Sequence, residues 1–326
     1  MRRPSYSLIM PRAIAILAID RSLEPDRARF APELRHLLDA LDPSQLHAPA
    51  PIPSSFQLLK RDDRGAVFRA RMMNRDVVIK ATVLSPLARL KSLARISKGW
   101  RHLRNAAWLE THAIPTARVL LLARAGRSEL LIMDALPGRS LLHHLADPRR
   151  TPTADHALAD AAGELVARVT HAGRCNRDHK PSNLIVTALR PPIAEISIID
   201  CVGLIALGPL TRPIQGPLRM LSSMVIEPLG CNVLPRRALL MRTLRAYLRA
   251  SWHLAEHPRA HRPLTSEPES YTFPIPISDE QRAWELASIR AFWSEITRTV
   301  LAHANPVPAI NPLATPPALN TPIAPA

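Results

Sequence analysis

Apolar and polar residues follow different patterns in the two halves of the chain, and the pattern of the first half is typical of a β-sheet. Three short runs, Phe56–Leu59, Ala66–Ala70 and Asp76–Lys80, are rich in apolar residues and are separated by polar turns. This pattern predicts a three-stranded meander. Two later runs, Val119–Ala123 and Glu129–Asp134, predict two further strands.

A helix is expected between the third and fourth of these runs. Ile96, Trp100, Leu103 and Ala107 recur every three or four residues, which is the spacing of one helix face. Pro115 should follow its end, because a proline forces the preceding residue into an extended conformation.

Helical spacing dominates after residue 137. One expected helix ends before Gly173, a residue suited to the left-handed position after a helix. Another begins at the capping box Ser278–Gln281. The apolar positions of three expected helices are Leu158, Ala162, Leu165 and Val169; Leu240, Leu244, Tyr247 and Leu248; and Ile289, Phe292, Trp293, Ile296 and Val300.

These patterns predict an α+β protein with a small β-rich lobe, residues 51–136, and a larger helical lobe, residues 137–303. Residues 1–50 are interpreted as an N-terminal extension with a helix around Pro32–Leu41. Residues 304–326 form a Pro- and Ala-rich tail without charged side chains, which we expect to be disordered.

Composition narrows the functional classes. The net charge is +16, which favours anionic partners. The three cysteines form no CxxC pair, so neither a disulfide framework nor a zinc site is indicated, and a reducing cytoplasm fits best. The apolar run Ala13–Ile19 is too short for a signal sequence or a membrane span. Any membrane association is therefore expected to be peripheral.

The segment from Asn176 to Val186 carries the most informative chemistry. It contains Arg177, Asp178, Lys180 and Asn183 in the R-D-x-K-x-x-N spacing of a kinase catalytic loop. It follows the helix that closes at Gly173 and continues into an apolar strand. A second apolar run ends in Asp200, and Pro191–Pro192 separates the two runs. A hairpin of this kind brings Asn183 close to Asp200.

Phosphoryl transfer explains these residue types, because it depends on positioning and on charge neutralisation. Asp178 would accept the proton of the attacking hydroxyl, and Lys180 would stabilise charge on the γ-phosphate of ATP. Asn183 and Asp200 offer the hard oxygen ligands that Mg²⁺ prefers. Lys80 ends the strand-like run Val77–Lys80 and would hold the α- and β-phosphates. The chain has five lysines, and two of them stand at these positions.

Gly65 and Glu110 are two further candidates for ATP binding, and each has an alternative explanation. Gly65 stands where a phosphate-covering loop belongs, yet no G-x-G-x-x-G pattern is present and an ordinary hairpin turn explains it equally well. Glu110 is the acidic residue between Lys80 and Glu129 and is predicted on the buried stripe of its helix. It either pairs with Lys80 or is an incidental charge at the helix end.

Arginines are frequent after Asp200. They could contact a phosphorylated sugar or lipid head group, or they could form a solvated basic face. The residues are Arg212, Arg219, Arg236, Arg237, Arg242, Arg245 and Arg249.

Residues 56–303 resemble the bacterial lipopolysaccharide core kinases, which phosphorylate Kdo or heptose sugars and share the protein-kinase fold. Besides the catalytic loop, the resemblance includes Arg104–Thr116, Arg219–Ser223 and Leu244–Leu248. It implies a bilobal, protein-kinase-like fold and an ATP- and Mg²⁺-dependent transfer of the γ-phosphate to a sugar hydroxyl. The acceptor that it implies is an anionic sugar or lipid-linked glycan, and no nucleic-acid partner is expected. The resemblance also implies a cytoplasmic protein with peripheral association at the cytoplasmic face of the inner membrane.

The sequence departs from the kinase pattern in two further places. Asn176 stands where the catalytic loop usually has His, and Gly203 comes one residue later than in D-F-G. Two alternatives remain: a protein Ser/Thr kinase, which the missing A-P-E segment disfavours, and a nucleotide-binding pseudokinase or scaffold, which the intact Asp178 and Asp200 disfavour.

Overall fold

The computed structural model describes residues 14–20, 23, 32, 56–62, 65–72, 74–125, 128–208, 214–256, 278–303 and 312–314. They divide into two compact units. The first contains the described residues up to Leu103 together with Arg118–Ala135. The second contains Arg104–Ala117 and the described residues from Leu136 to Ala314. The protein is of mixed α+β class, with an antiparallel sheet and seven α-helices among the described residues.

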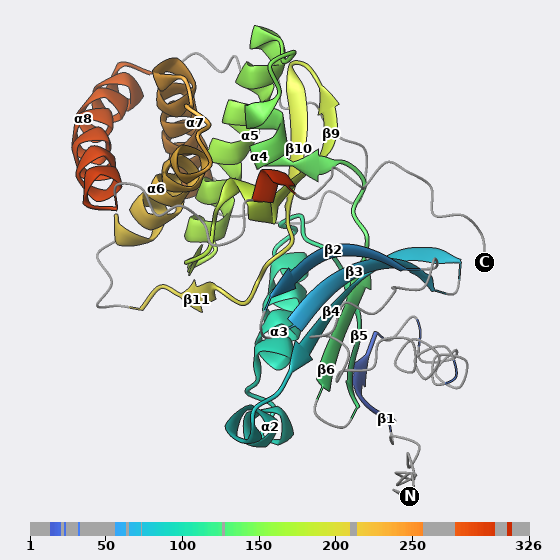
Figure 1. Cartoon of the computed structure of the whole chain (residues 1–326). Helices are drawn as coiled ribbons and strands as arrows, with labels where there is room; N and C mark the ends of the chain where they lie inside the picture. The colour runs from blue at the N-terminus through green and yellow to red at the C-terminus, as the bar shows by residue number, and fades with distance from the viewer. Residues whose placement is uncertain are drawn as a thin grey trace, which may run out of the picture. The chain divides into compact units, whose positions relative to one another are not determined.

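The first unit is built on a six-stranded antiparallel sheet (Figure 1) with the strand order β1-β5-β6-β4-β3-β2. All five strands expected from the sequence are present. The bounds of the strands are β1 Ile14–Ile19, β2 Phe56–Asp62, β3 Gly65–Met72, β4 Arg75–Val83, β5 Val119–Ala125 and β6 Ser128–Asp134.

The alternation of side chains along the strands builds the core of this unit. Phe68 on β3, Val77 and Ile79 on β4, and Leu121 and Ile132 from β5 and β6 are completely buried in one apolar cluster. Successive residues of a strand point to opposite faces, so residues two apart share this core.

Strand β1 was not expected, since the sequence analysis assigned its residues to an N-terminal extension. It pairs antiparallel with β5 at the edge of the sheet, with Ile14 opposite Ala125 and Ile19 opposite Leu121. The expected helix around Pro32–Leu41 lies outside the described residues, apart from Pro32 itself.

Two helices follow β4. Helix α2 spans Pro86–Leu93 and was not expected, whereas α3, Lys98–Thr111, is the helix expected after the third strand. The apolar stripe predicted for α3 is wrong. Ile96 precedes the helix and Ala107 is exposed, while the buried positions are His102, Asn105, Ala106 and Leu109. Two of those four side chains are polar, so hydrophobic periodicity could not identify this face.

The second unit contains five helices and two small sheets, one with the strand order β10-β9-β7 and one formed by β11 and β8 (Figure 1). Helix α5 ends at His171, just before the expected Gly173. It packs against α7, and an added Cβ at Gly163 would meet the backbone of α7. The helices are α4 Leu141–Ala146, α5 Pro152–His171, α6 Gln215–Gly230, α7 Arg237–Glu256 and α8 Asp279–Ala302. The strands are β7 Arg139–Ser140, β8 Arg174–Asn176, β9 Leu184–Arg190, β10 Ile193–Ile198 and β11 Leu204–Ala206.

The start of α8 and the hairpin of this unit agree with the sequence-based predictions. Ser278 accepts a hydrogen bond from the amide of Gln281 at the start of α8. Strands β9 and β10 pair antiparallel, and Pro191–Pro192 connect them. Pro312–Ala314 form one short 3-10 turn, and the rest of the expected tail lies outside the described residues.

Candidate active site

The segment with the kinase-loop spacing connects β8 to β9 in the second unit. Gly173 follows α5 with a φ of 84°, a left-handed conformation that glycine adopts without strain. The chain then forms β8, which pairs with β11 so that Asn176 lies opposite Leu204. Residues 177–183 follow, and their last three residues form a short 3-10 turn, Pro181–Asn183.

Asp178, Lys180 and Asn183 converge within this loop. The Lys180 ammonium lies 3.2 Å from a carboxylate oxygen of Asp178. The Asn183 amide nitrogen donates at 3.0 Å both to the Asp178 carboxylate and to the Asp178 carbonyl. The Asp178 side chain remains 47% exposed, so a bound molecule could reach its carboxylate. Three of the residues predicted to act together are therefore neighbours.

Asn176 joins this loop to Asp200. Its side chain is completely buried. The amide nitrogen donates to the Asp200 carbonyl at 3.2 Å, and the amide oxygen accepts from the Asp178 backbone N–H at 3.1 Å. The Ile199 N–H donates to the Asn183 carbonyl at 3.0 Å. The asparagine in place of histidine thus holds the backbone of both aspartates.

Gly203 is required by the close packing of this region. A Cβ at position 203 would lie 2.6 Å from the Asn176 amide oxygen and 3.0 Å from the Asp178 backbone nitrogen. The Gly203 carbonyl also accepts from the Arg177 N–H at 3.0 Å. Any side chain here would displace the loop that carries Asp178.

Asn183 and Asp200 have the donor atoms that a magnesium site needs. The Asn183 amide nitrogen is used for Asp178, so its amide oxygen is the atom that could ligate a cation. Asp200 accepts from the Val202 N–H at 3.2 Å through one carboxylate oxygen. Mg²⁺ keeps several waters and needs only one or two protein oxygens. These two residues therefore fit the ion.

The candidate phosphate-binding residues Lys80 and Gly65 belong to the first unit. Lys80 lies within β4, opposite Val67 on β3 and Leu131 on β6, and its side chain is half-buried. Gly65 begins β3 opposite Thr82, and a Cβ there would overlap the Ala81 carbonyl. Strand packing alone thus explains a glycine at this position.

Glu110 does not lie on the buried face of α3, contrary to the sequence-based expectation. It is exposed, next to the buried Leu109 and near the end of the helix. The expectation was wrong because it placed the stripe through Leu103 and Ala107, whereas the buried face passes through Asn105 and Leu109.

Glu227 on α6 contacts the loop and was missed by the sequence analysis. It accepts hydrogen bonds from the Ser182 N–H at 2.8 Å and the Ser182 hydroxyl at 2.5 Å. Burial raises the pKa of Glu227, and the Ser182 bonds and Lys180 partly oppose this shift. A lone acidic residue in the apolar run of α6 was the one sequence signal that could have indicated it.

His179 separates Asp178 from Lys180 in sequence, but its ring is completely buried. Neither ring nitrogen has a hydrogen-bond partner within the described structure. Burial lowers the pKa of His179 to about 3, so the ring is neutral at ordinary pH. His179 is therefore a packing residue of the loop.

Of the seven arginines singled out in the sequence after Asp200, three form ion pairs between helices. Arg242 on α7 forms a two-point ion pair with Asp160 on α5. Arg245 and Arg249 both bind the buried Glu285 on α8, at 2.6 Å and 3.2 Å. Arg219, Arg236 and Arg237 are exposed, and Arg212 lies outside the described residues.

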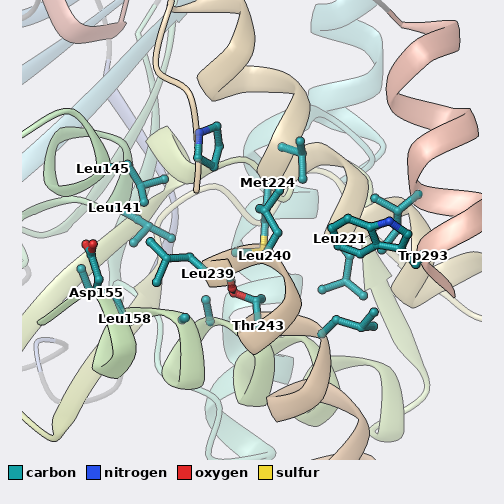
Figure 2. Close-up of a pocket in the computed structure, with 16 residues that line it drawn as sticks. Leu141, Leu145, Asp155, Leu158, Leu221, Met224, Leu239, Leu240, Thr243 and Trp293 are labelled. Atoms are coloured by element: carbon teal, nitrogen blue, oxygen red, sulfur yellow. The ribbon is translucent and has the colours of Figure 1, made fainter. Parts of the chain in front are cut away.

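An apolar cavity of about 60 Å³ lies among α4 to α8 (Figure 2). Its lining is mostly leucine and alanine, with Trp293 on one side. Its two polar groups have partners: the Asp155 carboxylate lies 2.6 Å from Arg150, and the Thr243 hydroxyl donates to the Leu239 carbonyl. No residue predicted for phosphoryl transfer lines this cavity.

No known family profile matches the chain, and no curated protein matches it at a significant level. Within the described residues, no three His, Cys, Asp or Glu side chains are clustered as metal ligands, and no helix has the length and apolar character needed to cross a membrane.

Proposed function

We propose that this chain is an ATP-dependent kinase that transfers the γ-phosphate to a sugar hydroxyl. The observation that carries the proposal is the arrangement of Asp178, Lys180 and Asn183, in which a carboxylate, an ammonium and an amide lie in direct contact on one loop. The hydrogen bond from the Asn176 side-chain amide to the Asp200 carbonyl supports it, because it fixes a second carboxylate-bearing residue beside that loop.

The proposal includes a bilobal, protein-kinase-like fold, with the first unit as its β-rich lobe and the second as its helical lobe. Lys80 on the central strand β4 supports this assignment, since kinases carry a phosphate-binding lysine on such a strand. The acceptor proposed is an anionic sugar or lipid-linked glycan, as the resemblance to lipopolysaccharide core kinases and the charge of +16 suggest.

In this reaction the acceptor oxygen bonds to the γ-phosphorus while the bond from that phosphorus to the bridging oxygen of ADP breaks. Asp178 orients the hydroxyl and accepts its proton. Lys180 stabilises the negative charge on the transferred group, and Lys80 holds the remaining phosphates. Asn183 and Asp200 would hold Mg²⁺, which neutralises phosphate charge when bound.

The test is a phosphoryl-transfer assay with γ-labelled ATP against Kdo, heptose, core lipid and a generic peptide. Asp178→Asn should lower turnover by roughly 10² to 10⁴ and retain Mg·ATP binding, because the carboxylate is needed for the proton and not for the nucleotide. Isothermal titration measures the binding.

Asp160→Asn is the matched control, since it removes a half-exposed carboxylate paired with Arg242 far along α5 from the loop. It should keep full turnover. Undiminished activity of Asp178→Asn on the preferred acceptor would exclude this assignment. Efficient transfer to the peptide and none to sugars would favour a protein kinase, and nucleotide binding without any transfer would favour a pseudokinase.

A further inference from the structure

Helix α2 presents a row of exposed leucines in the first unit. Leu87, Leu90 and Leu93 are 63%, 62% and 63% exposed, and Ile96 just after the helix is 52% exposed. These are four of the nine large hydrophobic side chains that are exposed among the described residues, and they fall within ten consecutive positions. An apolar group of this kind marks an interaction site more often than scattered single residues do.

Hydrogen bonds on the opposite side of α2 fix the outward direction of this row. The Ser92 hydroxyl donates at 2.8 Å to the buried carboxylate of Glu129 on β6. The same carboxylate accepts from the Ser97 hydroxyl at 2.7 Å and from the Gly99 N–H at 3.0 Å, at the start of α3. With about 100° of rotation per residue, Leu90 lies roughly opposite Ser92. The leucines are therefore held away from the sheet.

Basic side chains flank the leucine row. Arg89 and Lys91 each lie about 100° around the helix from Leu90, on its two sides. Arg95, Lys98 and Arg101 are exposed in the residues that follow. Residues 85–101 contain these five basic residues and no acidic one.

We propose that α2 and the turn after it, residues 86–98, form a docking surface for an anionic membrane. A helix that lies in a bilayer interface buries an apolar face at the acyl boundary and keeps Lys and Arg among the lipid phosphates. The row of leucines with cations on both sides satisfies both requirements. Nucleic acid would bind the basic side chains through its phosphates but would make no use of an apolar surface formed by three exposed leucines. A protein partner would need an acidic rim around an apolar centre.

Docking of this kind is independent of the proposed phosphoryl transfer, so it is tested without nucleotide. The full-length protein is floated with phosphatidylcholine vesicles that contain phosphatidylglycerol, and with pure phosphatidylcholine vesicles. Binding is expected to the first kind, and at most weakly to the second. L87Q/L90Q should weaken partitioning by at least about tenfold, because two apolar side chains no longer enter the bilayer.

K91Q/R95Q should weaken binding to the anionic vesicles by about fivefold for each charge removed. The matched controls lie on α8: L286Q/L301Q removes two equally exposed leucines, and R282Q/R290Q removes two exposed arginines. Both should bind like the unmodified protein. All four variants should keep their melting temperature, since the altered side chains face solvent.

Equal vesicle binding by L87Q/L90Q and by the α8 control would overturn the proposal. A second result would also overturn it: the protein binds neither kind of vesicle, and light scattering shows an oligomer that L87Q/L90Q converts to a monomer. In that case the leucines would form a protein–protein contact. Either result leaves the kinase assay unaffected, so the two proposals fail separately.

Discussion

His179 illustrates at the residue scale how the candidate loop combines chemistry with packing. Its two neighbours in sequence are the charged residues Asp178 and Lys180, which remain partly exposed, whereas its own ring is fully buried and without hydrogen-bond partners in the described structure. The ring therefore anchors the loop in the protein interior, while the side chains of Asp178 and Lys180 remain partly exposed. The sequence pattern leaves this position unspecified, so its burial could not be predicted.

The burial of His179 makes the stability of the protein depend on pH. Its pKa is lowered from 6.5 to about 3 in the folded state by desolvation. Between these values the unfolded chain binds a proton that the folded protein does not, so acidification favours unfolding. The free energy of unfolding should fall by about 1.4 kcal/mol for each pH unit below 6.5.

Replacing the ring by an apolar side chain should remove this dependence. The loss of stability between pH 7 and pH 5 should be smaller by about 2 kcal/mol in His179→Leu than in the unmodified protein. Urea unfolding at the two pH values measures it. His156→Leu on the exposed side of α5 is the control and should change nothing. Identical pH dependence in His179→Leu and the unmodified protein would contradict the buried, neutral state.

At the scale of elements, the contact between α6 and the 3-10 turn positions the loop. Glu227 accepts hydrogen bonds from both the N–H and the hydroxyl of Ser182, which lies between Lys180 and Asn183. Because both bonds go to Ser182, which is not predicted to react, the role of Glu227 would be to position the loop.

Glu227→Ala should lower kcat with little change in the KM for ATP, because the turn that orients Lys180 and Asn183 loses its support. Stability should fall by about 1 to 3 kcal/mol, the cost of an unsatisfied polar group. Glu227→Gln should recover most of both losses, since its amide oxygen still accepts from the Ser182 N–H. A KM effect without a kcat effect would argue against positioning.

Regular alternation of apolar and polar residues along the strands, and clear capping residues at helix ends, explain which elements could be predicted from the sequence. The five expected strands, the end of α5 and the start of α8 follow from residues adjacent in sequence. The buried face of α3 could not be predicted in this way. Asn105 is buried because its side chain donates hydrogen bonds to the carbonyls of Cys201 and Leu204, almost a hundred residues away in sequence. The contact of Glu227 with Ser182 depends on tertiary structure in the same way. The membership of β1 in the sheet required its partner β5, which no local pattern reveals.

At the scale of the whole molecule, the net charge and the apolar surface act over different distances. A net charge of +16 attracts any anionic surface from a distance, and salt screens this attraction within about 10 Å at 0.1 M. Ion pairs such as those of Arg242, Arg245 and Arg249 on α7 cancel charges within the protein and leave this net excess unchanged. The leucines of α2 act only at contact and are insensitive to screening.

This difference predicts how salt should act on vesicle binding. L87Q/L90Q keeps every charge, so it should still adsorb weakly to anionic vesicles at about 0.1 M salt, and this adsorption should vanish at about 1 M, where screening is nearly complete. The unmodified protein should lose part of its affinity over the same range and then reach a plateau, because inserted leucines hold it after the charges are screened. Flotation across a salt series measures both curves, with L286Q/L301Q following the unmodified protein. A curve for the unmodified protein that falls to zero together with that of L87Q/L90Q would mean that charge alone holds the protein, and that α2 does not insert.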